Sequence, residues 1–121
     1  MPSERAATQR RRRLLREQVR TLSLGPLMRG SLVERVRRCG RANCACATDP
    51  RRQHKGKFLT VPLDGRTQAL HVRPEDEEHV GVAIGAYTRL WQLINELTAC
   101  EFADLRRAAR ERRRARRRRH S

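Results

Sequence analysis

Three cysteines lie close together in the sequence, at Cys39, Cys44 and Cys46, and the chain has one further cysteine, Cys100. Thiolates are soft metal ligands, and His54 follows eight residues after the last of the three as a candidate fourth ligand. Zinc prefers four nitrogen and sulfur ligands in a tetrahedron, and a closed set of this kind stabilises a fold. The spacing C-x4-C-x-C differs from the usual pair of C-x2-C knuckles. We expect a structural zinc site at Cys39, Cys44, Cys46 and His54.

Two other roles for these thiols stay open. They could pack as weak hydrophobes in a metal-free turn. One could instead be a reactive thiolate, because the neighbouring Arg37, Arg38 and Arg41 would lower its pKa. No Cys–His–acid set is visible, so we expect neither an enzyme nor a small-molecule substrate. Cys100 is expected to pack on a helix and His71 to be a structural histidine on a strand.

The positive charge of the chain is large and sits mainly at its two ends. The net charge is +16, of which residues 1–24 carry +5 and residues 101–121 carry +7. A GC-rich genome would explain 27 arginines beside two lysines, but it would not explain the excess of charge. Such a surface attracts polyanions, nucleic acid above all and an acidic membrane surface less well. The arginines expected to contact phosphates are Arg10, Arg11, Arg12, Arg13, Arg37, Arg38, Arg41, Arg112, Arg113, Arg114, Arg116, Arg117, Arg118 and Arg119.

The start of the chain has no apolar signal segment, and no stretch approaches the roughly 20 apolar residues of a membrane span. We therefore expect a cytoplasmic protein without membrane contact, in which the thiols stay reduced.

The sequence pattern predicts a helix, three strands and a second helix. Residues 6–24 have apolar residues at helical spacing, although a frayed basic arm is the alternative for this segment. Strands are expected over residues 30–38, 57–63 and 66–72, the last two joined by Asp64-Gly65, a dipeptide typical of a type I′ hairpin turn. Pro62 cannot donate a ladder hydrogen bond, so it should face an edge or a bulge.

A long helix is expected from Pro74, with acidic residues in its first turns. Its packing face would be formed by Val80, Ile84, Tyr87, Trp91 and Ile94, widened by Leu90 and Leu97. Gly81 and Gly85 weaken this helix and would permit close backbone approach. Like-charge repulsion favours disorder of residues 106–121 until a polyanion neutralises them, and the sequence leaves their helicity open.

Residues 28–35 and 39–46 resemble a family of small prokaryotic proteins described as a domain of unknown function. In that family a Gly-Ser-Leu strand leads into a Cys-Gly-Lys-x-Asn-Cys-x-Cys knuckle, followed by His-Gly-Pro-aromatic, a hairpin and a helix. The resemblance covers about residues 28–98, although residues 54–58 read His-Lys-Gly-Lys-Phe here. It implies a shared fold in which the three cysteines and His54 act as one unit. Members occur among mobile-element and plasmid genes, which implies a nucleic-acid setting.

Together these patterns predict an α+β domain in which a small three-stranded antiparallel sheet with a cysteine-rich knuckle packs against a long C-terminal helix. Residues 1–26 would be a basic N-terminal helix or arm, residues 27–105 the domain and residues 106–121 an arginine-rich tail. The leading function is non-enzymatic nucleic-acid binding, of DNA rather than RNA, as an accessory of mobile-element or gene-control machinery. Without an exposed aromatic pair on the sheet, base stacking is not expected. The alternative is a protein-interaction or dimerisation module that docks through residues 80–98.

Overall fold

The computed structural model describes residues 3–120 and has the predicted α+β fold. Its contacts divide it into two compact units, Met1–Gly25 with Thr88–Ser121 and Pro26–Tyr87. The longest helix, α2, contributes residues to both units. The helices and strands are α1 (Glu4–Ser23), β1 (Ser31–Arg37), β2 (His54–Leu63), β3 (Arg66–Val72) and α2 (Glu77–Arg119), with short 3-10 helices η1 (Ala45–Ala47), η2 (Pro50–Arg52) and η3 (Pro74–Asp76).

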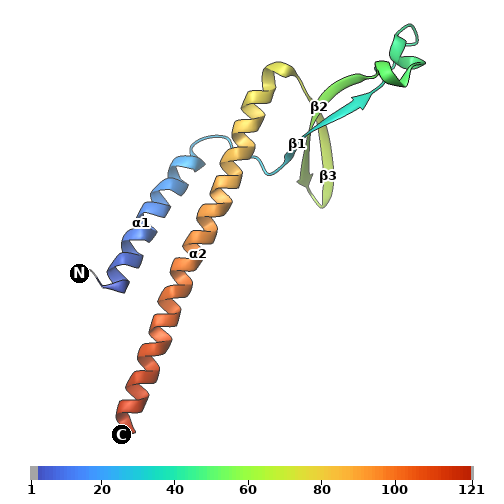
Figure 1. Cartoon of the computed structure of the whole chain (residues 1–121). Helices are drawn as coiled ribbons and strands as arrows, with labels where there is room; N and C mark the ends of the chain where they lie inside the picture. The colour runs from blue at the N-terminus through green and yellow to red at the C-terminus, as the bar shows by residue number, and fades with distance from the viewer. Residues whose placement is uncertain (1–2, 121) are drawn as a thin grey trace. The chain divides into compact units, whose positions relative to one another are not determined.

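The first unit is a pair of antiparallel helices, formed by α1 and the part of α2 from residue 88 onward (Figure 1). Leu15 of α1 is buried against Leu93 and Cys100 of α2. This burial confirms the packing role expected for Cys100. The core is completed by partly buried Val19, Leu22 and Leu97.

The packing face predicted for this part of α2 is only partly correct, because Leu97 packs in the core of the helix pair but Trp91 and Ile94 do not. Trp91 is 55% exposed and Ile94 is 40% exposed, whereas Leu93 is fully buried. The helix carries two apolar stripes at helical spacing, and the one that includes Leu93 and Leu97 meets α1. The other stripe therefore remains exposed within this unit.

Charged side chains link the two helices beside this core. Arg11 donates to Glu96 at 2.7 Å, and Arg12 donates to Glu101 at 2.8 Å and also to Asp104. Near the start of α1, Glu4 lies 3.7 Å from Arg110. Because low residue numbers of α1 pair with high numbers of α2, these contacts fix the antiparallel alignment.

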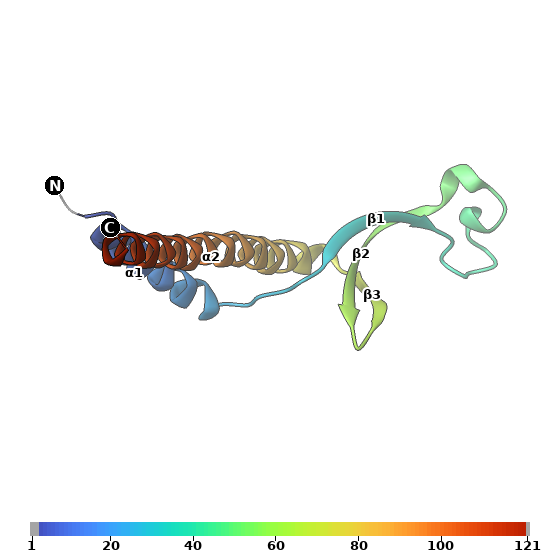
Figure 2. The ribbon, with the colours of Figure 1, turned by 90° about the horizontal axis from the view of Figure 1, so that it is seen from below.

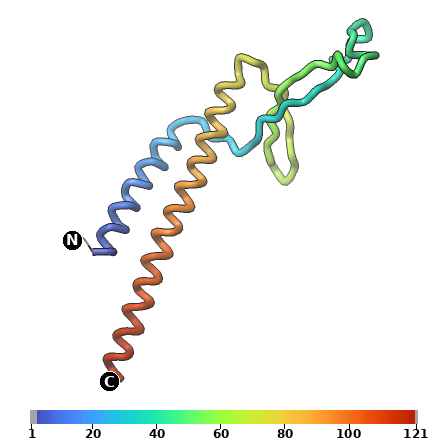
Figure 3. The backbone as a smooth tube through the Cα atoms, viewed as in Figure 1, coloured from blue at the N-terminus to red at the C-terminus, as the bar shows by residue number. Residues whose placement is uncertain are grey.

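Both ends of this unit are helical. Ser3 caps α1 by accepting a hydrogen bond from the backbone N–H of Ala6 at 3.1 Å, which satisfies one of the free donors of the first turn. The helix begins at Glu4, two residues earlier than predicted. At the other end, α2 continues as one helix to Arg119, through the arginine-rich residues whose helicity the sequence left open (Figure 3).

The second unit is built on a three-stranded antiparallel sheet of order β1-β2-β3. Asp64 and Gly65 have φ angles of 53° and 75°, the two positive values that a type I′ turn requires. The predicted hairpin is thus confirmed. The pairing of β1 with β2 ends at Ser31↔Thr60, so Pro62 lies where β2 has no neighbour on the β1 side. This position explains how a central strand tolerates a proline.

One face of the sheet packs against the first turns of α2. Leu59 and Val72 are buried together with Val80, and the partly buried Ile84 lies beside them. Here the predicted packing face of α2 is correct. A Cβ on Gly30 would lie 2.8 Å from the carbonyl oxygen of Thr60, so the start of β1 requires glycine to approach β2 closely. By contrast, a Cβ on Gly81 or Gly85 would meet nothing within 4 Å, so the close approach expected at these positions is not observed.

Candidate metal centre

Cys39, Cys44, Cys46 and His54 form a group that could hold a metal ion. One ligand atom from each residue lies within 4.8 Å of the others. The Sγ atoms of Cys39 and Cys46 are 3.5 Å apart, and Cys44 Sγ lies 3.3 Å from His54 Nε2. All four cysteines of the chain are free thiols. The structure therefore brings together the four ligands that the sequence predicted.

The connection between β1 and β2 positions these ligands at one end of the sheet (Figure 2). Cys39 follows β1 by two residues, and Cys46 lies in η1. His54 is the first residue of β2 and pairs with Arg37, the last residue of β1. β2 thus begins three residues earlier than predicted, and its extra length places the imidazole beside the thiols.

Local backbone geometry folds the loop around the thiols. Gly40 adopts a φ of 84°, a left-handed conformation that glycine reaches without steric cost. The backbone N–H of Cys44 donates to the carbonyl of Arg41 at 3.2 Å, which closes a turn between the first two cysteines. Asp49 caps η2 by accepting from the backbone N–H of Arg51 at 3.0 Å. These features hold the loop without a covalent crosslink.

The three thiols differ in environment. Cys46 is fully buried, Cys44 is partly buried and Cys39 is exposed. The pKa of Cys44 is lowered, first by a backbone hydrogen bond from Cys46 and then by the side chains of Cys46 and Cys39. For Cys46 the backbone N–H of Cys39, at 3.3 Å from its Sγ, lowers the pKa, but burial and the two neighbouring thiols outweigh it and raise the pKa overall.

The set of Cys39, Cys44, Cys46 and His54, here called the metal-ligand group, opens to solvent on one side. A pocket of about 460 Å³ is lined by Cys39, Cys44 and His54 together with Arg41 and Asn43. The ligands are thus accessible to an ion from solution. Arg41 contributes a cationic side chain to the lining of the pocket.

The arginines predicted to contact phosphates fall into different surroundings. Arg11 and Arg12 hold carboxylates of α2, and the Arg12 side chain is only 15% exposed. Hydrogen bonding to Asp104, followed by attraction to Asp104 and Glu101, raises the pKa of Arg12 against the opposing effect of burial. These two arginines therefore form ion pairs that join the two helices. Arg10 and Arg13 are exposed on the same helix.

Around the sheet, Arg37 lies on β1, whereas Arg38 and Arg41 lie in the cysteine loop and are exposed. The guanidinium of Arg37 is 5.4 Å from the centre of the Phe58 ring, and that of Arg35 is 5.8 Å from it. Arg35 was not among the arginines predicted from the sequence. The alternation of side chains along β1, which places residues 35 and 37 on one face, is the signal that could have found it.

The end of α2 carries the densest positive charge. Seven arginines lie among residues 112–119, here called the arginine segment, and each is exposed. No aspartate or glutamate follows Glu111 in the sequence. The segment comprises Arg112, Arg113, Arg114, Ala115, Arg116, Arg117, Arg118 and Arg119.

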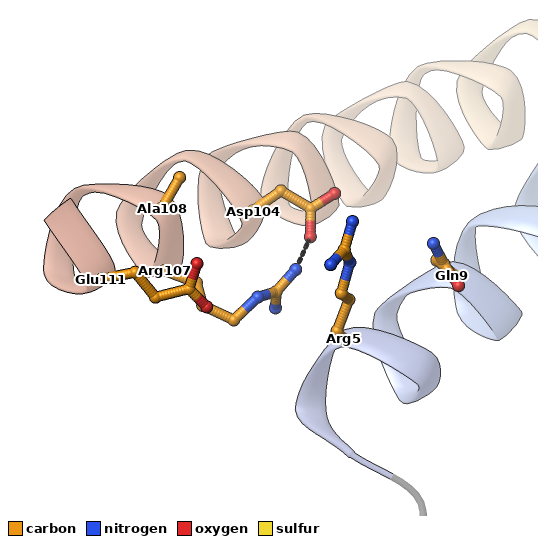
Figure 4. Close-up of a pocket in the computed structure, with 6 residues that line it drawn as sticks. All are labelled: Arg5, Gln9, Asp104, Arg107, Ala108 and Glu111. Atoms are coloured by element: carbon orange, nitrogen blue, oxygen red, sulfur yellow. Dashed lines mark hydrogen bonds and ion pairs between the residues drawn. The ribbon is translucent and has the colours of Figure 1, made fainter. Parts of the chain in front are cut away.

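A separate pocket of about 240 Å³ lies in the helix pair, between the start of α1 and the last third of α2 (Figure 4). Arg5 and Arg107 oppose Asp104 and Glu111 there, and Arg107 donates to Asp104. The charges of the lining balance, and neither a histidine nor a cysteine is among the lining residues. This arrangement favours helix pairing.

The fold and the cysteine–histidine group define a small α+β domain with a candidate metal centre. A family model described as "Domain of unknown function (DUF6788)" matches residues 5–80, and the chain belongs to this family. The match includes α1, which lies outside the resemblance at residues 28–98. No curated protein and no solved structure matches the chain. Among the described residues, no helix has the length and apolar character needed to cross a membrane.

Proposed function

We propose that this protein is a non-enzymatic nucleic-acid-binding protein whose arginine segment contacts the phosphates of duplex DNA. The observation that carries the proposal is the uninterrupted helix through residues 112–119, with seven exposed arginines that follow Glu111, the last acidic side chain of the sequence. An eight-residue helical segment is about 12 Å long. Along that length a duplex presents about seven phosphate charges, so several arginines can bind at once.

Ion pairing inside the helix pair supports the choice of this segment over the first helix. Arg107 and Arg110 contact Asp104 and Glu4, and Arg12 contacts two acids. The positive charge before Glu111 is therefore partly neutralised within the protein. Exposed Arg10 and Arg13 would add to phosphate binding in a secondary role. The resemblance to a family with members among mobile-element and plasmid genes supports an accessory role in DNA mobility or gene control.

Removal of residues 112–121 tests this function. The truncated chain keeps the Arg107–Asp104 and Arg110–Glu4 pairs, so it should lose only the helix signal of the removed residues and retain its melting temperature. Its affinity for a random-sequence DNA duplex should fall about tenfold or more near 0.1 M salt, measured by fluorescence anisotropy. Unchanged affinity would overturn the proposal. Unfolding of the truncated chain would also contradict the proposal, because it would show that the arginine segment is needed for folding.

We propose zinc as the ion of the Cys39, Cys44, Cys46 and His54 group. Around a tetrahedral zinc, ligand atoms at 2.0–2.3 Å from the metal stand about 3.3–3.8 Å from one another. The two short separations, 3.3 Å and 3.5 Å, fall in this range. Three thiolates and one imidazole would close the coordination sphere, so the ion would hold the β1–β2 connection in place.

Metal analysis of the purified protein tests the zinc proposal. Mass spectrometry under native conditions should find one zinc per chain, and cobalt(II) exchanged into the site should give the intense visible absorption of a tetrahedral thiolate complex. A chelator should increase proteolysis of the loop between β1 and β2. A metal-free protein that resists proteolysis equally would contradict the proposal.

Self-association through α2 is a second candidate function. Trp91, Phe102 and Leu105 are each more than half exposed on this helix. Residues 90–105 contain three acidic residues and no basic residue, so two copies repel each other least there. Sedimentation equilibrium should find a dimer that Trp91→Ala with Phe102→Ala converts to a monomer. A monomeric parent protein would exclude this candidate.

A further inference from the structure

We propose that the open face of the sheet binds single-stranded nucleic acid, with a base stacked on Phe58 and phosphates held by Arg35 and Arg37. This inference rests on the proposed function only in taking nucleic acid as the class of ligand. Its residues lie in a different unit from the arginine segment.

Strand register defines the open face. β1 places Arg35 opposite Gly56 and Val33 opposite Phe58, and β3 places His71 opposite Phe58. Since neighbouring residues of a strand point to opposite faces, these side chains share one face, and Leu59 with its buried neighbours lies on the other. α2 packs on the Leu59 face. The face that carries Phe58 is thus the one that α2 leaves uncovered within this unit, and Phe58 itself is partly buried there under the side chains of Arg35 and Arg37.

The Phe58 ring is held by its neighbours on this face. His71 meets it edge-on, with ring centroids 5.3 Å apart and an interplanar angle of 71°. A Cβ on Gly56 would lie 3.2 Å from His71 Nε2, so glycine leaves room for the imidazole. No exposed aromatic pair was expected on this sheet, whose strands hold Phe58 as their one aromatic residue apart from histidine. The structure supplies the pair as phenylalanine with histidine.

Among the positions of the three strands, the one acidic side chain, Glu34, lies on the covered face. Glu34 points to the covered side, where Lys57 donates to Glu77 at 3.1 Å. None of the positions that the three strands place on the open face carries a carboxylate. The guanidinium groups of Arg35 and Arg37, 5.8 Å and 5.4 Å from the ring centre, therefore have no acidic partner among these positions.

This combination matches the chemistry of single-strand binding. Proteins that bind single strands combine cations that follow the backbone with aromatic rings on which bases stack. In a duplex the bases are stacked on one another, so a ring on a sheet has access only to unpaired bases. The ligand class is thus a single strand rather than a duplex.

The metal-ligand group borders the same face. His54 pairs with Arg37 in the register and lies on the face of Phe58. A filled metal site would fix this end of β2 and with it the position of Arg37. Arg38 and Arg41 in the adjacent loop extend the positive surface beyond the sheet.

Substitutions at Phe58 test the proposal in the full-length, metal-loaded protein. The probes are oligothymidine and oligouridine of about 12 nucleotides, followed by fluorescence anisotropy. Phe58→Leu should weaken binding of at least one probe about fivefold or more, whereas Phe58→Tyr, which keeps the aromatic face, should stay close to the parent. Arg35→Gln with Arg37→Gln should also weaken it, and Arg29→Gln with Arg66→Gln is the charge-matched control. Melting temperature and zinc content should be unchanged in each variant.

Photocrosslinking provides an independent measurement. Ultraviolet irradiation of the complex with oligothymidine should label the tryptic peptide of residues 58–66. Labelling confined to other peptides, or equal affinity of Phe58→Leu and the parent, would overturn the proposal. The duplex-binding test of the truncated chain is independent of this one, because the residues removed there are none of those proposed to bind the single strand.

Discussion

Single glycines distinguish positions where the fold needs close backbone contact from positions where it does not. At Gly30 an added Cβ would lie 2.8 Å from both Thr60 O and Val61 Cγ1. At Gly81, in the exposed part of a helix, it would meet nothing within 4 Å. Both residues precede apolar segments in the sequence. The sequence alone therefore does not show which of the two glycines is required for close backbone contact.

Gly30→Ala and Gly81→Ala should therefore change stability in opposite directions. We expect Gly30→Ala to lower the free energy of unfolding by about 1–3 kcal/mol, because β1 must move away from β2. Gly81→Ala should raise it by up to about 1 kcal/mol through helix propensity. Urea denaturation measures both changes. A stabilising Gly30→Ala would contradict the strand contact described.

Cys44 and Cys100 provide a matched pair for the metal site. Cys44→Ser should abolish stoichiometric metal binding, since it removes one of the four ligands. Cys100→Ala should retain the metal and lower the free energy of unfolding by about 1 kcal/mol, because it leaves a small cavity beside Leu15 and Leu93. Elemental analysis of both variants checks the pair. Equal metal contents would argue against the ligand set.

At the scale of the elements, the hairpin and the metal-ligand group follow directly from the sequence. Asp64-Gly65 selects a turn with two positive φ angles, and the three cysteines are near one another by chain distance alone. Local rules of this kind need no partner from elsewhere in the chain. The position of His54 depends also on where β2 begins. The strand starts at His54 itself, which brings the imidazole beside Cys44.

The packing of α2 depends on residues distant in sequence, and there the prediction was only partly correct. Leu93 and Trp91 both belong to apolar stripes, but only the stripe of Leu93 matches Leu15 of α1. The ion pairs of Arg11 and Arg12 with acids of α2 are equally non-local. The sequence of one segment does not reveal these partners. Arg11 and Arg12 were therefore predicted to contact phosphates, although each forms ion pairs within the helix pair.

The helix pair should weaken in acid. Hydrogen bonding from Arg12 lowers the pKa of Asp104 despite partial burial, and Arg107 adds to the effect. A carboxylate with a lowered pKa stabilises the fold above the unfolded value of about 3.9, and this stabilisation is lost as the pH falls through the folded value. The free energy of unfolding should therefore decrease below about pH 4.

Asp104→Asn should have a lower free energy of unfolding than the parent at pH 7. Its free energy of unfolding should also decrease less between pH 5 and pH 2, an interval that spans ordinary carboxylate titration at roughly pH 4. Glu17→Gln, at an exposed position on α1, is the control and should behave as the parent does. Urea denaturation at several pH values measures the difference. Parallel pH profiles of Asp104→Asn and the parent would exclude a role for this ion pair.

At the scale of the whole molecule, the two units divide the proposed tasks. The helix pair neutralises part of its own charge and leaves the arginine segment exposed. The sheet unit carries the metal-ligand group and the open face with Phe58. The two proposals thus assign phosphate contacts without base recognition to one unit and an aromatic surface to the other.

The salt dependence of duplex binding tests the central claim most directly. A charge-matched pair of fourfold glutamine variants is compared with the parent protein, by anisotropy titrations over a range of salt concentrations. Each lost phosphate contact lowers the magnitude of the slope of log K against log salt by about 0.9. The variants replace Arg112, Arg113, Arg116 and Arg117 in the segment, or Arg16, Arg20, Arg29 and Arg66 as the control.

We predict that the segment variant reduces the magnitude of this slope by about 2 to 4, whereas the control changes it by less than about 1. Equal slopes for the two variants would show that the arginine segment makes no phosphate contacts of its own, and would contradict the account.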